Sequence, residues 1–330
     1  MIKQGNALEL LQELEESSIA TAYFDPPFNT GRDFALDSTE EGKKVKFSDK
    51  WDSDEAYQQF IDPVVSELAR VLKPDGSLFF HISAAEMFIP ELVCRRHFKN
   101  VKPIFWKKSR SKNNVKKKLG ATIDVIFQCS AAKEPKFNPV YQPLDAYYLE
   151  NSYKNKDDRG YYALGHLVNG RTRTIDPADD QAKPADKQRL YSYEHTNGET
   201  CRTWNPPNGW RLSKEALLDL VGENRVHFPA GKGNLYRKIY KHESKGKPAT
   251  DLWDDIHSIA QGSERFYPTQ KPDKLLERIV EMSSDPGDTV LDPMAGSGTT
   301  PAAARRLGRK YIAFDLSEEA VRIMKEKREL

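Results

Sequence analysis

The segment TVLDPMAGSGTTPAAARRLGRKYIAFD, residues Thr289–Asp315, contains the pattern that decides the fold. A short β-branched run ends at Asp292, and a turn with Gly296 and Gly298 follows it. A helical segment then leads to a second apolar run, which ends at Asp315. This order is typical of parallel α/β units, which bind ligands at the carboxyl ends of their strands. An acid at the end of the second strand typically accepts hydrogen bonds from ribose hydroxyls.

The spacing of residues in this turn limits the classes of ligand that it could bind. No Gly-Lys-Ser/Thr follows the glycines, which excludes a P-loop, and Pro301 stands where the dinucleotide fingerprint has its third glycine. The turn therefore favours a nucleoside cofactor with a small acidic or zwitterionic tail. A plain strand, turn and helix with a capping aspartate is the alternative.

Both ends of the chain alternate between predicted strands and helices. We expect strands at residues 21–25, 77–83, 101–108, 123–130, 289–292 and 309–315, and helices at 53–72, 272–284 and after Ser317, with a turn at KPDG, 73–76. The segment 134–265 is irregular and rich in Tyr, Asn, Asp, Gly and Pro. We therefore predict an α/β fold with a doubly wound, mostly parallel, Rossmann-like sheet, in which residues 134–265 separate 1–133 from 266–330.

The composition limits the classes to which the protein could belong. Hydrophobic residues make up 38% of the 330 residues and charged residues 30%, with a formal net charge of +2. No apolar run has the length of a membrane span, and no signal-like stretch opens the chain, so we expect a cytoplasmic protein without a membrane partner. Cys94, Cys129 and Cys201 lack metal-ligand spacing, so we expect reduced thiols and no metal site.

Basic residues are concentrated in two runs. Residues 107–118, KKSRSKNNVKKK, contain no acid, and residues 232–247, KGNLYRKIYKHESKGK, contain one acid and two tyrosines. Such runs are either solvated loops or phosphate contacts along a nucleic-acid groove.

A second motif lies near the amino terminus, in AYFDPPFNTGRDF, residues Ala22–Phe34. A carboxylate, two prolines and an aromatic ring follow an apolar run. The motif is either a rigid buried turn or a site that grips a flat nitrogenous base.

The two motifs together resemble the amino-group DNA methyltransferases, which use S-adenosylmethionine to methylate N6 of adenine or N4 of cytosine. DPPF, residues 25–28, precedes the insertion, and DPMAGSGTT, residues 292–300, follows it, an order similar to the beta class. IKQGNALELL from Ile2, DLWDDI from Asp251 and FYPTQKPDKLLERIV from Phe266 also resemble family segments. Two departures are Met294, where many relatives have an aromatic, and Phe28, where Tyr is commoner.

The resemblance implies S-adenosylmethionine as cofactor, with no metal. It implies that Asp25 and the Pro26 carbonyl accept hydrogen bonds from the target amine, that Pro26 and Pro27 hold them rigid, and that Phe28 stacks on the base. The implied cofactor residues are Asn6, Asp25, Thr269, Lys271, Asp292, Pro293, Met294, Ala295, Gly296, Ser297, Gly298, Thr299, Asp315 and Leu316. The target base must be flipped out of the duplex.

We therefore expect a site-specific adenine-N6 DNA methyltransferase, with a cytosine-N4 enzyme as the alternative. A non-catalytic DNA-binding protein and an RNA or protein amine methyltransferase are further alternatives. Residues 1–133 would be the catalytic half, 134–265 the target-recognition region and 266–330 the cofactor half. The predicted contacts to double-stranded DNA are Lys107, Lys108, Arg110, Lys112, Lys116, Lys117, Arg211, Lys232, Arg237 and Lys238.

The resemblance also suggests a homodimer and a cognate restriction endonuclease, although no surface in the sequence identifies either. NPPNGW, residues 205–210, resembles a second amine-gripping motif. We favour a structural turn there, because no strand is expected before it.

Overall fold

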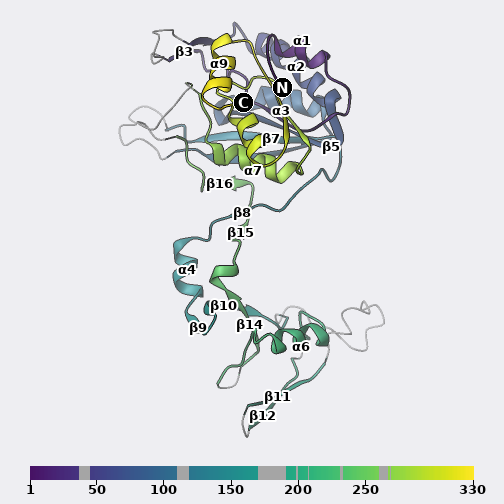
Figure 1. The fold of residues 1–330 in the computed structure, drawn as a ribbon, viewed down its shortest axis with the longest axis vertical. Helices are drawn as coiled ribbons and strands as arrows, with labels where there is room; N and C mark the ends of the chain where they lie inside the picture. Colours follow the sequence, from purple (N-terminus) through teal and green to yellow (C-terminus); the bar gives the residue numbers. More distant parts are fainter. Residues whose placement is uncertain are drawn as a thin grey trace. The chain divides into compact units, whose positions relative to one another are not determined.

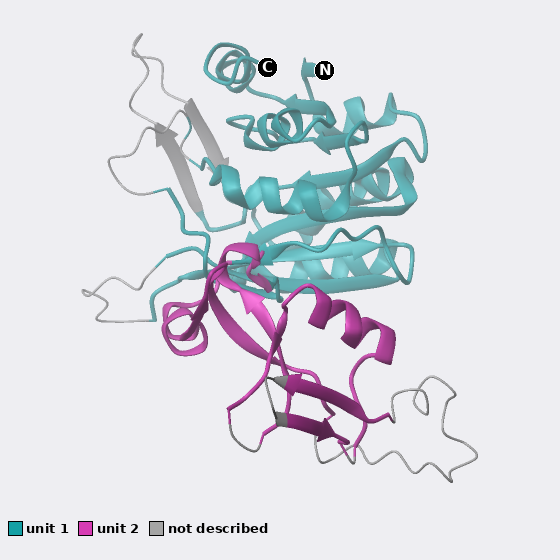
Figure 2. Ribbon diagram, turned by 60° about the horizontal axis from the view of Figure 1, so that its bottom comes forward, with its two compact units in different colours: residues 1–142, 248–330 teal, residues 143–247 magenta. Residues whose placement is uncertain are grey.

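The computed structural model describes residues 1–36, 45–109, 119–169, 191–197, 200–206, 208–230, 233–259, 267 and 269–330. The chain divides into two compact units, one formed by residues 1–142 and 248–330 and the other by 143–247 (Figure 2). The smaller unit lies within the insertion expected at 134–265. Residues 134–142 and 248–259 belong instead to the larger unit, since the Asn138 amide donates to the carbonyls of Glu281 and Ser284.

An eight-stranded sheet forms the centre of the larger unit (Figure 1). Its strands, in spatial order, are β1 (Ile2–Gln4), β18 (Lys310–Asp315), β17 (Thr289–Asp292), β2 (Ile19–Phe24), β5 (Leu72–Ser83), β7 (Ile123–Ser130), β6 (Asn100–Lys107) and β16 (Leu252–Trp253). Only β7 is antiparallel to its neighbours in this sheet. The predicted mostly parallel sheet is confirmed, and β2 lies between β17 and β5 although β17 is far away in sequence.

Helices cover both faces of this sheet, as the doubly wound prediction requires. Successive strand residues point to opposite faces. Phe24, Phe80 and Phe127 therefore join one core with α1 (Ala7–Gln12), α2 (Asp54–Val71) and α3 (Phe88–His97). Tyr23, Phe79 and Ile126 join the core of the other face with α7 (Asp273–Ser283) and α8 (Thr299–Arg306). The last helix, α9 (Glu318–Glu326), contacts β1 and β18.

Local capping signals are reproduced in these helices. The Ser53 hydroxyl accepts a hydrogen bond from the Ala56 amide at 3.2 Å, and the Ser317 hydroxyl accepts one from the Ala320 amide at 3.3 Å. KPDG is different, because the turn expected at 73–76 lies inside β5. Pairing with β2 jumps there from Leu72 to Ser77, so these residues form an irregularity within one strand.

The smaller unit has its own core around Trp210, Leu217 and Leu235. It contains an antiparallel sheet in the order β13 (Val226–His227), β14 (Tyr236–Tyr240), β10 (Gly160–His166) and β9 (Asn155–Asp157), the hairpin β11 (Tyr193–Asn197) and β12 (Thr200–Trp204), and the helices α4 (Ala146–Ser152) and α6 (Lys214–Gly222). The remaining elements are β3 (Arg32–Leu36), β4 (Val45–Asp49), β8 (Tyr141–Gln142), β15 (Lys247–Pro248), η1 (Ala84–Glu86) and η2 (Lys241–Glu243).

The environment of NPPNGW differs from the prediction in one respect. A strand, β12, does precede it, contrary to the expectation. The segment nevertheless turns, because the Gly209 amide donates to the Pro206 carbonyl at 2.9 Å and Gly209 has a φ of 70°. Among the described residues, no helix is long and apolar enough to cross a membrane.

Candidate active site

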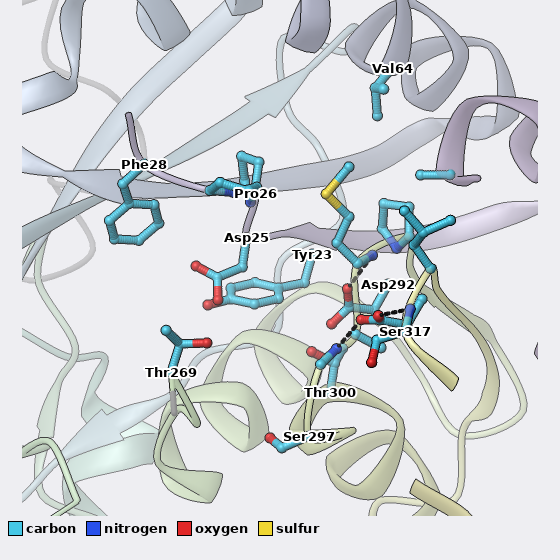
Figure 3. Close-up of a pocket in the computed structure, with 18 of the residues that line it drawn as sticks. Tyr23, Asp25, Pro26, Phe28, Val64, Thr269, Asp292, Ser297, Thr300 and Ser317 are labelled. Atoms are coloured by element: carbon cyan, nitrogen blue, oxygen red, sulfur yellow. Dashed lines mark hydrogen bonds between the residues drawn. The ribbon is translucent and has the colours of Figure 1, made fainter. Parts of the chain in front are cut away.

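Three aspartates stand at the carboxyl ends of three adjacent strands. Asp25 directly follows β2, Asp292 ends β17 and Asp315 ends β18. They line a cavity of about 740 Å³, which we call the strand-end cavity (Figure 3). Because the strand order brings β2 beside β17, the two motifs from opposite ends of the chain face one space.

Asp25 has one occupied and one unoccupied carboxylate oxygen. Lys271 donates a hydrogen bond to Oδ2 and also lies over the Phe28 ring, 5.4 Å from its centroid. Oδ1 is buried and has no hydrogen-bond partner among the described residues. The His81 ring nitrogen Nδ1 lies 3.8 Å from it. A buried acceptor without a donor costs free energy, so this oxygen is an unsatisfied acceptor of the DPPF motif.

The DPPF segment is held from two sides. The Tyr57 hydroxyl of α2 donates to the Pro27 carbonyl at 2.9 Å. After the motif, the Asp49 carboxylate accepts hydrogen bonds from the Asn29 amide at 2.6 Å and the Thr30 amide at 3.1 Å. No described residue donates to the Pro26 carbonyl. The motif therefore keeps one backbone acceptor free while its neighbour is fixed.

The glycine-rich turn is shaped by Asp315. Its Oδ2 accepts from the Gly296 amide and its Oδ1 from the Ser317 amide, both at 2.8 Å. Burial raises the pKa of the Asp315 carboxyl, although these two amides lower it. Gly296 has a φ of 50°, and a Cβ there would lie 3.2 Å from the Tyr267 ring. Glycine at this position thus permits both the left-handed backbone and the close contact of the turn with Tyr267.

Asp292 is buried beneath the same turn. Its Oδ1 accepts from the Met294 amide at 3.1 Å, and the Thr300 hydroxyl also donates to its carboxylate. Burial raises the pKa of Asp292 to about 7, with smaller contributions from the charges of Asp25 and Asp315, while the hydrogen bonds lower it. A cationic group in the cavity would favour the ionised form of this carboxyl.

Nearly all residues predicted for the site line the strand-end cavity. The lining includes all four residues of DPPF and, from the predicted cofactor set, Asn6, Asp25, Thr269, Lys271, Asp292, Pro293, Met294, Ala295, Gly296, Ser297, Thr299, Asp315 and Leu316. Gly298 is the exception, because it is not among the residues that line the cavity. Its φ is 74°, and a Cβ there would lie 2.5 Å from Met324 of α9, so this glycine serves helix packing.

The cavity suits a nucleoside cofactor with a zwitterionic tail. Its volume lies in the range of ligand sites, and a carboxylate lines it at each of the three strand ends. The Asn6 side chain caps α1 by accepting from the Leu8 amide at 2.9 Å, which fixes it at the cavity wall. Among the described residues, no group of three His, Cys, Asp or Glu could hold a metal ion.

Several residues at or behind the site escaped the sequence prediction. Tyr23, Asp49 and Tyr267 line the cavity, while His81 and Asp124 lie buried behind it. The sequence signal that could have identified His81 and Asp124 was a polar residue inside an apolar strand, as in FFHIS and IDVIF. Such a residue must find a hydrogen-bond partner, but the partner becomes visible only once the strand order is known.

The predicted DNA contacts separate into three groups. Lys107 and Arg237 are exposed, and the Arg211 Nε donates to the Val168 carbonyl at 3.1 Å. Lys108 and Lys238 form ion pairs with Asp124 at 2.6 Å and Asp157 at 2.8 Å within their own units, and their contacts to DNA stay predictions. Arg110, Lys112, Lys116, Lys117 and Lys232 lie outside the described residues.

The fold and the site define an α/β protein with a ligand cavity at the carboxyl ends of its parallel strands. A family model described as DNA methylase, N6_N4_Mtase, matches residues 19–326, and the chain belongs to this family.

Named proteins are similar to this chain along most of its length. The Type II methyltransferase M.EcaI of Enterobacter cloacae is 29% identical over 96% of this chain and 66% of its own length. The DNA adenine methyltransferase YhdJ of Escherichia coli K12 is 28% identical over 98% of this chain and 80% of its own. A solved structure titled PvuII DNA methyltransferase (cytosine-N4-specific) has a TM-score of 0.49 and 18% identity, covering 100% of this chain and 86% of the other. The chain spans 50% to 66% of the length of two curated relatives, M.EcaI among them.

Proposed function

We propose that this protein is a site-specific DNA methyltransferase that transfers a methyl group from S-adenosylmethionine to N6 of an adenine flipped out of duplex DNA. The observation that carries the proposal is the pair of free acceptors at the DPPF motif. Asp25 Oδ1 and the Pro26 carbonyl lack donors among the described residues, while their neighbours are held by Lys271 and Tyr57.

Two fixed acceptors suit an exocyclic amine. Its lone pair is delocalised into the base, so it is a poor nucleophile until the nitrogen gains tetrahedral character. Acceptors aimed at both amino hydrogens favour that change, and they cost no reorganisation if they are already in place. Asp25 and Pro26 supply these acceptors, and the partly buried Phe28 ring supplies a face on which the base stacks.

The cofactor contributes an electrophilic methyl group when bound. The amine nitrogen would take this methyl group as the carbon–sulfur bond breaks, and the displaced amino proton would pass to solvent. The residues of this chain bind and orient: Asp315 and Gly296 shape the nucleoside end of the cavity, while Asp25 positions the amine. Holding both reactants in line supplies much of the rate enhancement.

Adenine is favoured over cytosine because an acid leads the DPP motif. The family description includes both N6 and N4 methylation, and a cytosine-N4 activity is therefore the second candidate. The proposed DNA contacts of the described residues are Lys107, Arg211 and Arg237, and the unit 143–247 is the proposed target-recognition region. A homodimer and a companion restriction endonuclease stay predictions of the resemblance.

The test is nucleoside mass spectrometry of unmethylated DNA of diverse sequence, incubated with S-adenosylmethionine and each variant. N6-methyladenine is expected from the wild type and from Asp75→Ala, an exposed control, and not from Asp25→Ala. N4-methylcytosine would favour the second candidate. No methylated base, with cofactor binding shown by calorimetry, would reject DNA as the substrate of this chain alone.

A further inference from the structure

A line of four polar side chains lies behind Asp25 and has no part in the mechanism above. The Tyr23 hydroxyl lies 2.5 Å from His81 Nδ1, and His81 Nε2 lies 3.2 Å from Asp124 Oδ2. The Lys108 ammonium donates to Asp124 Oδ1 at 2.6 Å. Tyr23, His81 and Asp124 come from the adjacent strands β2, β5 and β7, and all three are buried.

The charges along this line determine the proton positions on His81. Hydrogen bonds from His81 and Lys108, together with the charge of the Lys108 ammonium, keep the pKa of Asp124 below its usual value although burial raises it. Asp124 is therefore an acceptor, and His81 Nε2 must carry a proton. Asp124 is paired with Lys108, and Asp25 is paired with Lys271, so neither leaves an unbalanced charge to stabilise a buried imidazolium. His81 is thus neutral, with Nδ1 free to accept.

Tyr23 is the only donor placed at that nitrogen among the described residues. Burial raises the pKa of the Tyr23 phenol well above its usual value, with Asp25 the next contributor, so the hydroxyl keeps its proton. His81 Nδ1 is also 3.8 Å from Asp25 Oδ1. Tyr23 and Asp25 therefore flank the same ring nitrogen, and Figure 3 shows the Tyr23 ring reaching toward the Asp25 carboxylate.

A phenol has one hydrogen to donate. If Tyr23 gave it to Asp25, Oδ1 would no longer be an empty acceptor. We infer that Asp124 and His81 hold the Tyr23 proton away from Asp25, so that Oδ1 stays free for the amino group of the target base. His81 and Asp124 are positioning residues in this scheme, and the Tyr23 proton is the group that they hold in place. The inference rests on the proposed function of Asp25.

The first test reads the tautomer directly, without substrate or cofactor. Long-range proton–nitrogen correlation spectra of protein labelled with ¹⁵N-histidine report which ring nitrogen is protonated, and the spectrum of His81→Gln assigns the His81 signals. We expect a neutral ring protonated at Nε2. A ring protonated at Nδ1, or at both nitrogens, would overturn the inference, because Nδ1 could then no longer accept the Tyr23 proton.

The second test asks whether the hydrogen bond from the Tyr23 hydroxyl to His81 affects the rate of methyl transfer. His81→Gln keeps an amide near Asp124 but removes the acceptor for Tyr23, whereas His81→Asn keeps an oxygen near the position of Nδ1. We expect His81→Gln to lower the methylation rate at saturating DNA about ten- to a hundredfold, and His81→Asn to lower it less. Thermal unfolding identifies any variant that fails to fold.

The third test asks whether removing the Tyr23 hydroxyl restores the methylation activity lost in His81→Gln. We expect Tyr23→Phe to methylate DNA faster than His81→Gln, and Tyr23→Phe/His81→Gln to recover most of the activity lost in His81→Gln. A double variant no better than His81→Gln, or a Tyr23→Phe variant as slow as it, would overturn the inference. If His81→Gln does not fold, the methylation rate of Tyr23→Phe compared with the wild type still tests the inference. A wild-type protein that leaves DNA unmethylated would reject the proposed function and with it the inference.

Discussion

Lys271 and Asp25, the first residue of the DPPF motif, are 246 residues apart in the chain and form an ion pair. The ammonium takes Oδ2 and leaves Oδ1 without a partner among the described residues. One cation thus fixes the orientation of the carboxylate that, in the proposed function, accepts a hydrogen bond from the target amine.

Removing this cation should slow methyl transfer. In Lys271→Met, Asp25 loses both its orienting donor and its neutralising charge, so we expect the methylation rate to fall about ten- to a hundredfold. Lys271→Arg should retain more activity, because it keeps the charge. Lys274→Met, an exposed change on α7, is the matched control. Equal rates for Lys271→Met and the control would show that the pair does not orient Asp25.

The Tyr57 hydroxyl should contribute to both stability and rate. Tyr57→Phe removes the donor to the Pro27 carbonyl and leaves the aromatic packing with Trp51 and Phe60 in place. We expect a loss of about 1 kcal/mol in the free energy of unfolding and a several-fold lower methylation rate. Denaturant unfolding and initial rates measure the two effects. Tyr147→Phe, at an exposed tyrosine, should change neither.

Asp292 should make the cofactor-free protein less stable as the pH rises. Its pKa is about 7 in the folded state and near 3.8 when unfolded, so between these values only the folded state holds the proton. Its stabilising contribution is complete below pH 3.8 and is lost as the pH rises to 7. Asp292→Asn cannot ionise. Its unfolding temperature relative to the wild type should therefore increase between pH 4 and 7 and then level off.

The stabilising contribution of Asp288 should depend on pH in the opposite direction. Hydrogen bonds from Lys73, the Asp285 amide and Lys136 outweigh burial and lower its pKa to about 2. Its contribution is present above pH 3.8 and is lost as the pH falls toward 2. Asp288→Asn should thus be less stable than the wild type at neutral pH. Parallel curves for both variants and the wild type would contradict the two assignments.

Gly296→Ala should weaken binding of S-adenosylmethionine. The new Cβ would lie 3.2 Å from the Tyr267 ring at the cavity wall, and the φ of 50° disfavours any side chain. Gly287→Ala is the control, because Gly287 also has a positive φ, of 90°, but a Cβ there meets nothing within 4 Å. Both variants carry backbone strain, and calorimetry should show weaker binding for Gly296→Ala alone. Equal affinities would mean that the turn does not approach the cofactor.

Local signals in the sequence predicted many of the elements of the larger unit. The strands ending at Asp292 and Asp315, the glycine-rich turn between them and the caps at Ser53 and Ser317 all depend on residues a few positions apart. Periodicity and capping act over one or two turns, so a single sequence displays them. The two motifs and their order likewise predicted the family and most residues of the strand-end cavity.

The tertiary structure alone decided how these elements use their side chains. β2 pairs with both β17 and β5, which brings Asp25, Asp292 and Asp315 to one cavity. Other tertiary contacts gave Lys108 and Lys238 their ion-pair partners and placed Gly298 against α9. The strand pairing also joined Tyr23, His81 and Asp124 in one line. Each of these roles depends on a partner distant in the chain, and strand order, which no local pattern encodes, selects that partner.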